Sequence, residues 1–119
     1  MNIEDFRDYC LSKKGVEETF PFDDVTLVFK VMGKMFAITG LDDEVFRVNL
    51  KCEPHRALQL REEHPDQIIP GWHMNKQHWN TVYFENGLNA KLLYELIDIS
   101  YDLIVSKLPK KDKEILDAL

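Results

Sequence analysis

Long apolar runs are absent from this sequence, and cysteine is scarce. No segment approaches the roughly 18 consecutive apolar residues of a membrane-spanning helix. The charged N-terminus, MNIEDFRDYC, lacks the basic flank and apolar core of a signal peptide. Two cysteines, Cys10 and Cys52, are too few for a disulfide scaffold, and their apolar neighbours favour buried, reduced thiols. We therefore expect a cytoplasmic chain that does not enter a membrane.

Internal repeats, linkers and low-complexity segments are absent as well. A length of 119 residues fits one domain, and a hydrophobic content of 45% is enough to bury a core. We predict a single domain over residues 1–119 and assume a monomer.

The sequence also lacks the motifs of common catalytic sites. There is no glycine-rich phosphate loop, nucleophile elbow or H-E-x-x-H segment. His73 and His78 are of the right type for acid–base work, but nothing identifies a nucleophile. Cys52 with His55, and His73 with His78, do not have the usual spacing of zinc ligands. We therefore assign no catalytic residue, metal or cofactor, and an enzyme is the least favoured function.

The charge that is present is acidic overall but unevenly distributed. The chain has 21 acidic against 15 basic residues and a net charge of −6, which argues against a general polycation. Residues 26–41, however, carry Lys30 and Lys34 and no acid, and residues 67–84 carry Lys76 alone. Most acids fall in segments with helical patterning. A basic surface can therefore exist on an acidic protein.

Helix signals stand at both ends of the chain. Asn2 can cap a first helix that Gly15 closes, and Asn89 can cap a long helix that Pro109 ends. An apolar stripe runs along the long helix at positions Leu93, Ile97, Ser100, Ile104 and Leu108. Residues 110–119 are predicted to be a short helix or a frayed tail.

A further helix is expected in the middle of the chain. Pro54 suits its first turn and Pro65 stops it, whereas Glu53 is a poor residue for its N-cap.

Strand signals lie between these helices. The runs TLVFKV, MFAITGL and EVFRVNLK are rich in β-branched and aromatic residues and predict a three-stranded antiparallel meander, and TVYF predicts a further strand. The fold class is therefore α+β, a two-layer sandwich of order α-β3-α-β1/2-α with helices on one face of a twisted antiparallel sheet. Strand alternation points Phe29, Phe36, Ile38, Phe46, Val48 and Leu50 to the helices. The opposite face then carries Lys30, Thr39, Arg47, Asn49 and Lys51.

The acid-free block GWHMNKQHWNTVYF, residues 71–84, has two interpretations. Trp79 could stack on a base, and an asparagine could pair with an adenine edge. Alternatively both tryptophans pack in the core or at its rim, Asn75 and Asn80 hold turns, and the histidines bond to carbonyl groups. We favour packing for each tryptophan, and a contact surface for His73, Asn75 and Lys76 together, because a turn needs only one such residue.

Four separated blocks in this order resemble the MmcQ/YjbR family over nearly the whole chain: FPFDDVTLVFKVMGKMFAI, RVNLKCEP, HPDQIIPGWHMNKQHWNTV and ELIDISYDLIVSKLPKK. The resemblance implies an antiparallel sheet covered on one face by helices, of the kind seen in secretion chaperones and frataxin. It also implies DNA binding through a double wing of β-hairpins. Carried over, the implied nucleic-acid-binding residues are Lys30, Lys34, Arg47, Asn49, Lys51, His73, Asn75, Lys76, His78 and Trp79.

Residues and resemblance together predict a phosphate-backbone-binding module with weak, low-specificity affinity for DNA or a small anionic ligand. The alternative is a small-molecule or peptide-binding module that uses the same face. One departure from the family pattern is the run Asp42, Asp43 and Glu44 at a hairpin tip, which would repel phosphate unless it points away.

Overall fold

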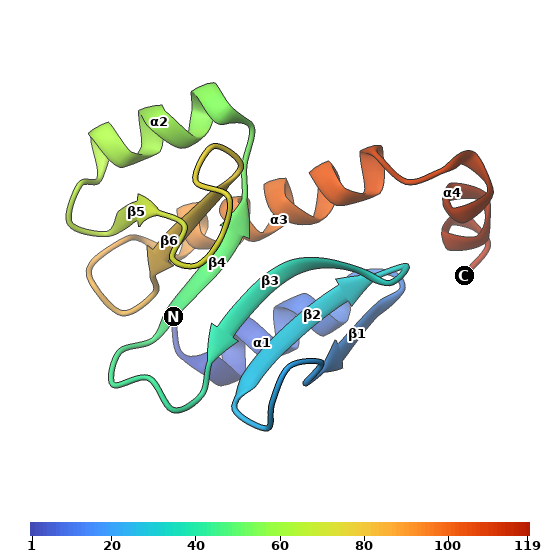
Figure 1. Cartoon of the computed structure of the whole chain (residues 1–119), viewed down its shortest axis with the longest axis horizontal. Coiled ribbons are helices and arrows are strands. Elements are labelled where there is room, and N and C mark those ends of the chain that lie inside the picture. Colours follow the sequence, from blue (N-terminus) through green and yellow to red (C-terminus); the bar gives the residue numbers. More distant parts are fainter.

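A six-stranded antiparallel sheet is the centre of the molecule. A computed structural model describes residues 1–119 and places the strands in the order β1-β2-β3-β4-β6-β5 (Figure 1). Their bounds are β1 (Val16–Thr19), β2 (Thr26–Val31), β3 (Lys34–Gly40), β4 (Arg47–Lys51), β5 (Ile68–Pro70) and β6 (Trp79–Tyr83). The predicted α+β class with an antiparallel sheet is confirmed.

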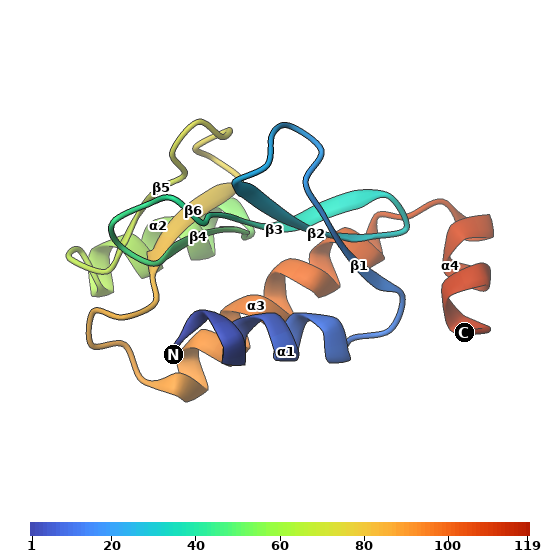
Figure 2. The same cartoon turned by 90° about the horizontal axis from the view of Figure 1, so that it is seen from below.

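The helices leave one face of this sheet open. They are α1 (Ile3–Ser12), α2 (Pro54–Glu63), α3 (Ala90–Ser106) and α4 (Lys110–Asp117). Figure 2 shows α1 and α3 lying side by side under one face, while the β1–β2 and β5–β6 loops stand on the other. We call that other side the open face. None of the four helices combines the length and apolar composition needed to cross a membrane.

Helix starts follow the expected caps, with one correction. The side chains of Asn2 and Asn89 accept hydrogen bonds from the backbone N–H groups of Asp5 and Leu92, as predicted. Glu53, expected to be a poor cap, accepts from the N–H groups of both His55 and Arg56. These two bonds hold the pKa of the Glu53 carboxyl below its usual value. A glutamate can therefore fold back and cap this helix by itself.

The C-terminal ten residues form a helix for most of their length. The side chain of Leu116 in α4 is buried, and it lies where a side chain on Gly15 would be. A Cβ at Gly15 would come within 2.5 Å of the Leu116 Cδ1 atom. Gly15 itself has a positive φ of 72° and lies beyond α1, which ends at Ser12. Its role is to turn the chain into β1 and admit α4, not to close the helix.

Two short edge strands lie outside the runs from which strands were predicted, although the predicted order allowed a second strand after the middle helix. β1, sequence VEET, and β5, sequence IIP, each pair on one side only, with β2 and β6 respectively. The pairing of β1 brings Glu17 directly opposite Lys30. An acid therefore stands on the open face, which strand alternation had predicted to carry only basic charges.

A β-bulge changes which residues of β3 face the helices. Phe29 pairs with Ala37, but the next residue, Lys30, pairs with Met35, so Phe36 is the extra residue between them. Beyond the bulge the alternation reverses: Ile38 lies on the open face and Thr39 on the helix face. The expected positions of Ile38 and Thr39 were therefore wrong. Thr39 is buried, and its hydroxyl donates to the carbonyl oxygen of Arg47.

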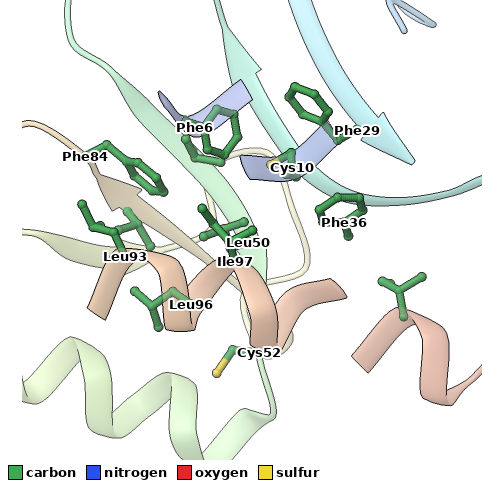
Figure 3. Close-up of a cluster of buried hydrophobic side chains, with 14 of the residues drawn as sticks. Phe6, Cys10, Phe29, Phe36, Leu50, Cys52, Phe84, Leu93, Leu96 and Ile97 are labelled. Atoms are coloured by element: carbon green, nitrogen blue, oxygen red, sulfur yellow. The ribbon is translucent and has the colours of Figure 1, made fainter. Parts of the chain in front are cut away.

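The main core fills the space between the sheet and the helices (Figure 3). The ring of Phe6 from α1 meets those of Phe29 and Phe84 edge-on, with centroids 5.4 and 5.3 Å apart. The predicted stripe of α3 is buried there, and the Ser100 hydroxyl in that stripe donates to the Phe36 carbonyl and accepts from the Lys51 N–H. This packing holds the sheet rigid beneath the open face.

Candidate binding groove on the open face

A groove of about 730 Å³ lies on the open face. Its strand residues come from β2, β3, β4 and β6: Thr26, Met35, Ile38, Gly40, Arg47, Asn49 and Thr81. Its remaining lining comes from three loops: Phe22, Asp42, Asp43, Trp72, His73 and Met74. The volume is within the usual range of ligand pockets.

Two aromatic side chains stand exposed at the groove. Phe22, in the β1–β2 loop, is 65% exposed, and Trp72, in the β5–β6 loop, is 48% exposed. Both loops rise from the open face in Figure 2. Large aromatic groups left in water are costly unless a partner covers them, and they dominate interface energetics. Sequence reasoning did not single out Phe22, although FPFDD places it between a proline and two aspartates.

The backbone of Trp72 is held by a closed set of hydrogen bonds. Its N–H donates to the Thr81 hydroxyl at 2.9 Å, and that hydroxyl donates to Asn49 Oδ1 at 2.5 Å. Asn49 Nδ2 then donates to the carbonyl oxygen of Trp72 at 3.1 Å. Asn49 and Thr81 are direct partners in the β4–β6 register, so the sheet itself fixes the position of Trp72. Asn49 was predicted to contact nucleic acid, but here its amide is engaged in positioning this residue.

Arg47 lies against the Trp72 ring. Its guanidinium carbon is 4.1 Å from the ring centroid, a cation–π contact, and its Nε donates to Asp43 Oδ2 at 2.7 Å. Burial disfavours its charge, but the bond to Asp43 leaves the pKa of Arg47 above its usual value. The arginine therefore supports the tryptophan and is already paired with an acid.

A small apolar cluster lies at one side of the groove. Val28, Ile38 and Trp79 are its buried members, and Met35 and Met74 pack against them. Trp79 is 8% exposed, so its ring packs inside the protein, as favoured from the sequence. Unbranched methionine side chains can adapt to differently shaped partners.

The rest of the predicted block forms a turn. Asn75 Oδ1 accepts from the N–H of Gln77, and Lys76 Nζ donates to the carbonyl oxygen of Gly71 at 3.0 Å. Arg61 of α2, which sequence reasoning missed, donates to Asn80 Oδ1 and to the Lys76 carbonyl. Asn75 and Lys76 therefore make bonds that hold the loop. No local pattern identifies Arg61, because its partners lie 15 to 19 residues away.

The two histidines of the block lie in different surroundings. His73 lines the groove with a left-handed φ of 57°, and its ring centroid is 5.4 Å from that of Trp72. His78 is half-buried, and its carbonyl accepts from the N–H of Cys52. No three His, Cys, Asp or Glu side chains converge in a way that could hold a metal ion.

The predicted lysines lie apart from the groove lining. Lys30 and Lys34 are next to the tight β2–β3 turn, and Lys51 ends β4 with its Nζ 6.0 Å from the Trp79 ring centroid. Burial and the nearby Lys107 ammonium lower the pKa of Lys51. None of the three has an ion-pair partner. The structure thus joins Arg47, Asn49 and His73 in one site and leaves these lysines outside it.

Most of the chain matches a known protein family. A family model described as YjbR matches residues 11–103. The chain is 34% identical to the uncharacterised protein YjbR of Escherichia coli K12 over 116 residues, which cover 98% of both chains. It is 38% identical to the uncharacterised protein YbdF of Escherichia coli O157:H7 over 99 residues, covering 83% of this chain and 80% of that one.

Solved structures have the same fold. The Deinococcus radiodurans protein DR2400, described as a DUF419 domain, has a TM-score of 0.90 and 41% identity, covering 98% of this chain and 88% of its own. A Pseudomonas syringae protein has a TM-score of 0.74 and 30% identity, covering 87% of this chain and 98% of its own.

Proposed function

Because the chain belongs to the YjbR family, and its relatives named above are described as uncharacterised, we propose a function from the site itself. The protein is a binding module that holds an apolar or aromatic group of its partner in the open-face groove. This corresponds to the small-molecule or peptide alternative weighed from the sequence.

The observation that carries this proposal is the exposed but fixed Trp72. Asn49 and Thr81 hold its backbone, and Arg47 lies against its ring. A ring that is rigid before binding loses little conformational entropy when a partner covers it. Met35 and Met74 beside it supply apolar surface that can adapt.

The test uses N-acetyl-tryptophanamide, an uncharged probe that presents one aromatic side chain. In titrations followed by amide chemical shifts, it is expected to move signals of the groove, and Trp72→Ala should remove these changes. Leu58→Ala is the matched control, because Leu58 is 53% exposed on α2, away from the groove lining. Absence of groove shifts up to the solubility limit of the probe would contradict the proposal.

A second candidate is binding of the DNA backbone, as the family resemblance implies. The observation in its favour is that Lys30, Lys34 and Lys51 have no acidic partner within ion-pair distance. Neutralisation of phosphates by cations releases counterions, so three contacts would give a log–log salt slope of about −3. Against it, Glu17 faces Lys30, and Arg47 is paired with Asp43.

Duplex DNA titrated at two salt concentrations tests this candidate. Replacing the three lysines by alanine should weaken binding for all sequences alike and flatten the slope. No binding at low salt would remove DNA from consideration, and a slope that is the same in the triple variant would exclude these three lysines as the contact site.

A further inference from the structure

Acidic side chains stand on two loops that contribute to the lining of the groove. Two loops supply them: Asp23 and Asp24 from the β1–β2 loop, and Asp42, Asp43 and Glu44 from the β3–β4 loop. The pairing of Thr26 with Gly40 brings the strand ends that carry these two loops side by side. Asp42 and Asp43 line the groove directly, whereas Glu44 lines a separate, smaller hollow with Phe46 and Tyr83.

Three of these five carboxylates have no compensating partner. Asp43 is paired with Arg47, and Asp23 accepts from the N–H groups of Val25 and Thr26. Asp24, Asp42 and Glu44 are exposed and make neither an ion pair nor a side-chain hydrogen bond. Like charges held close together in this way attract a cationic partner.

As a consequence, the charge on the open face changes sign along the β2–β3 hairpin. Lys30 and Lys34 are at its turn, and the acidic loops are at its opposite end. The groove and its exposed aromatic rings belong to the acidic end, because Phe22 precedes Asp23 in the same loop. Phe20, also in that loop, is 45% exposed. Apolar surface and negative charge are therefore presented together.

We propose that the partner held in this groove is a peptide segment in which an aromatic or large apolar residue is flanked by lysines or arginines. This inference rests on the proposed function and names the chemistry of its ligand. The apolar residue packs against Trp72 and Phe22, and the flanking cations approach Asp24 and Asp42. Since these acids and the exposed aromatic rings lie at the same end of the groove, a chain that carries cations next to its apolar residue can meet both.

The experiment uses three synthetic peptides with blocked ends and a fluorescein label: KAKWKAK, KAKAKAK and EAEWEAE. Binding is followed by anisotropy with the full chain at low salt. We expect KAKWKAK to bind at least tenfold more tightly than either other peptide. Trp72→Ala should reduce its affinity by about tenfold or more, as truncation of an interface tryptophan commonly does.

Charge variants test the acidic loops separately from the ring. The double change Asp24→Asn and Asp42→Asn should weaken KAKWKAK by about fivefold or more, since exposed charge pairs contribute modestly one by one. The matched control changes two exposed acids on α2 and α3, with Glu62→Gln and Glu95→Gln, and should alter affinity by less than about twofold.

The outcomes separate this inference from the proposed function. If EAEWEAE binds as tightly as KAKWKAK and both depend on Trp72, the groove binds an apolar group but the cationic preference is wrong. If neither peptide depends on Trp72, both proposals are wrong. If KAKAKAK binds as tightly as KAKWKAK, the groove is not a site for a basic aromatic segment.

Discussion

Gly71, at the base of the loop that presents Trp72, is the position where one methyl group should disturb the groove most. Its N–H donates to the carbonyl oxygen of Trp79 at 2.9 Å. A Cβ built on Gly71 would lie 2.8 Å from the Trp79 Cβ, 2.9 Å from its carbonyl oxygen and 3.1 Å from its carbonyl carbon. Two of these three atoms are backbone, so no flexible side-chain end can move aside.

The size of the effect follows from these distances. Carbon atoms in contact prefer about 3.5 to 4.0 Å, so Gly71→Ala must push β5 from β6 by several tenths of an ångström. Overpacking of this kind costs about 1 to 3 kcal/mol, and the stiffer unfolded chain returns about 0.4 to 1 kcal/mol. We therefore expect a net loss of about 1 to 2 kcal/mol, or a fall in Tm of roughly 4 to 8 °C.

Urea unfolding followed by far-ultraviolet circular dichroism measures this loss. Gly40→Ala is the matched control, since a Cβ there would meet Asp42 Oδ1 at 3.5 Å and Asp43 Cβ at 3.9 Å, which is ordinary contact. Without overpacking, the control should keep the gain from the stiffer unfolded chain and be stabilised by up to about 1 kcal/mol. If Gly71→Ala is as stable as Gly40→Ala, the close approach of Gly71 to Trp79 is incorrect, and so is the rigid support of Trp72.

Further predictions concern the same loop, the core and the absence of metal. Trp79→Ala should cost about 3 to 5 kcal/mol in unfolding experiments, because the ring is buried, whereas Trp72→Ala should cost little stability. Replacing Asn75 and Lys76 together by alanine should cost about 1 to 2 kcal/mol through lost loop bonds, and unchanged stability would favour their assignment as a contact surface. The hydrogen bond to Asp98 raises the pKa of Tyr9, and burial raises that of Cys10, each to about 12. The folded state favours the neutral form of both groups. Their contribution to the free energy of unfolding is therefore fully present below about pH 9 and should be lost as pH rises through 12. Tyr9→Phe should make this loss smaller. Chelation with EDTA should leave the circular dichroism unchanged, since no ligand set for a metal converges.

The helices and central strands could be predicted because their signals are local. The stripe from Leu93 to Leu108 in and after α3, and the Asn2 and Asn89 caps, depend on spacing and residue type alone. The edge strands could not, because β1 carries two glutamates in four residues and β5 is three residues long. Their strand character comes from pairing with neighbours that the sequence does not identify.

The groove was only partly predictable for the same reason. Arg47, Asn49 and His73 were singled out, but the bulge at Phe36 shifts the alternation of β3 and moves Ile38 onto the open face. Trp72 and Trp79 are the same residue type in one block, and only the tertiary contacts decide which ring is exposed.

The central claim, that Trp72 in the open-face groove meets the partner, can be tested with one spectroscopic measurement. The full chain labelled with 5-fluorotryptophan should give two fluorine signals, one for each of its two tryptophans, and Trp72→Phe assigns them. On titration with KAKWKAK, the Trp72 signal is expected to shift progressively and saturate, while the signal of the buried Trp79 moves far less. The account would be contradicted if anisotropy shows that the peptide binds to saturation while the Trp72 signal does not move.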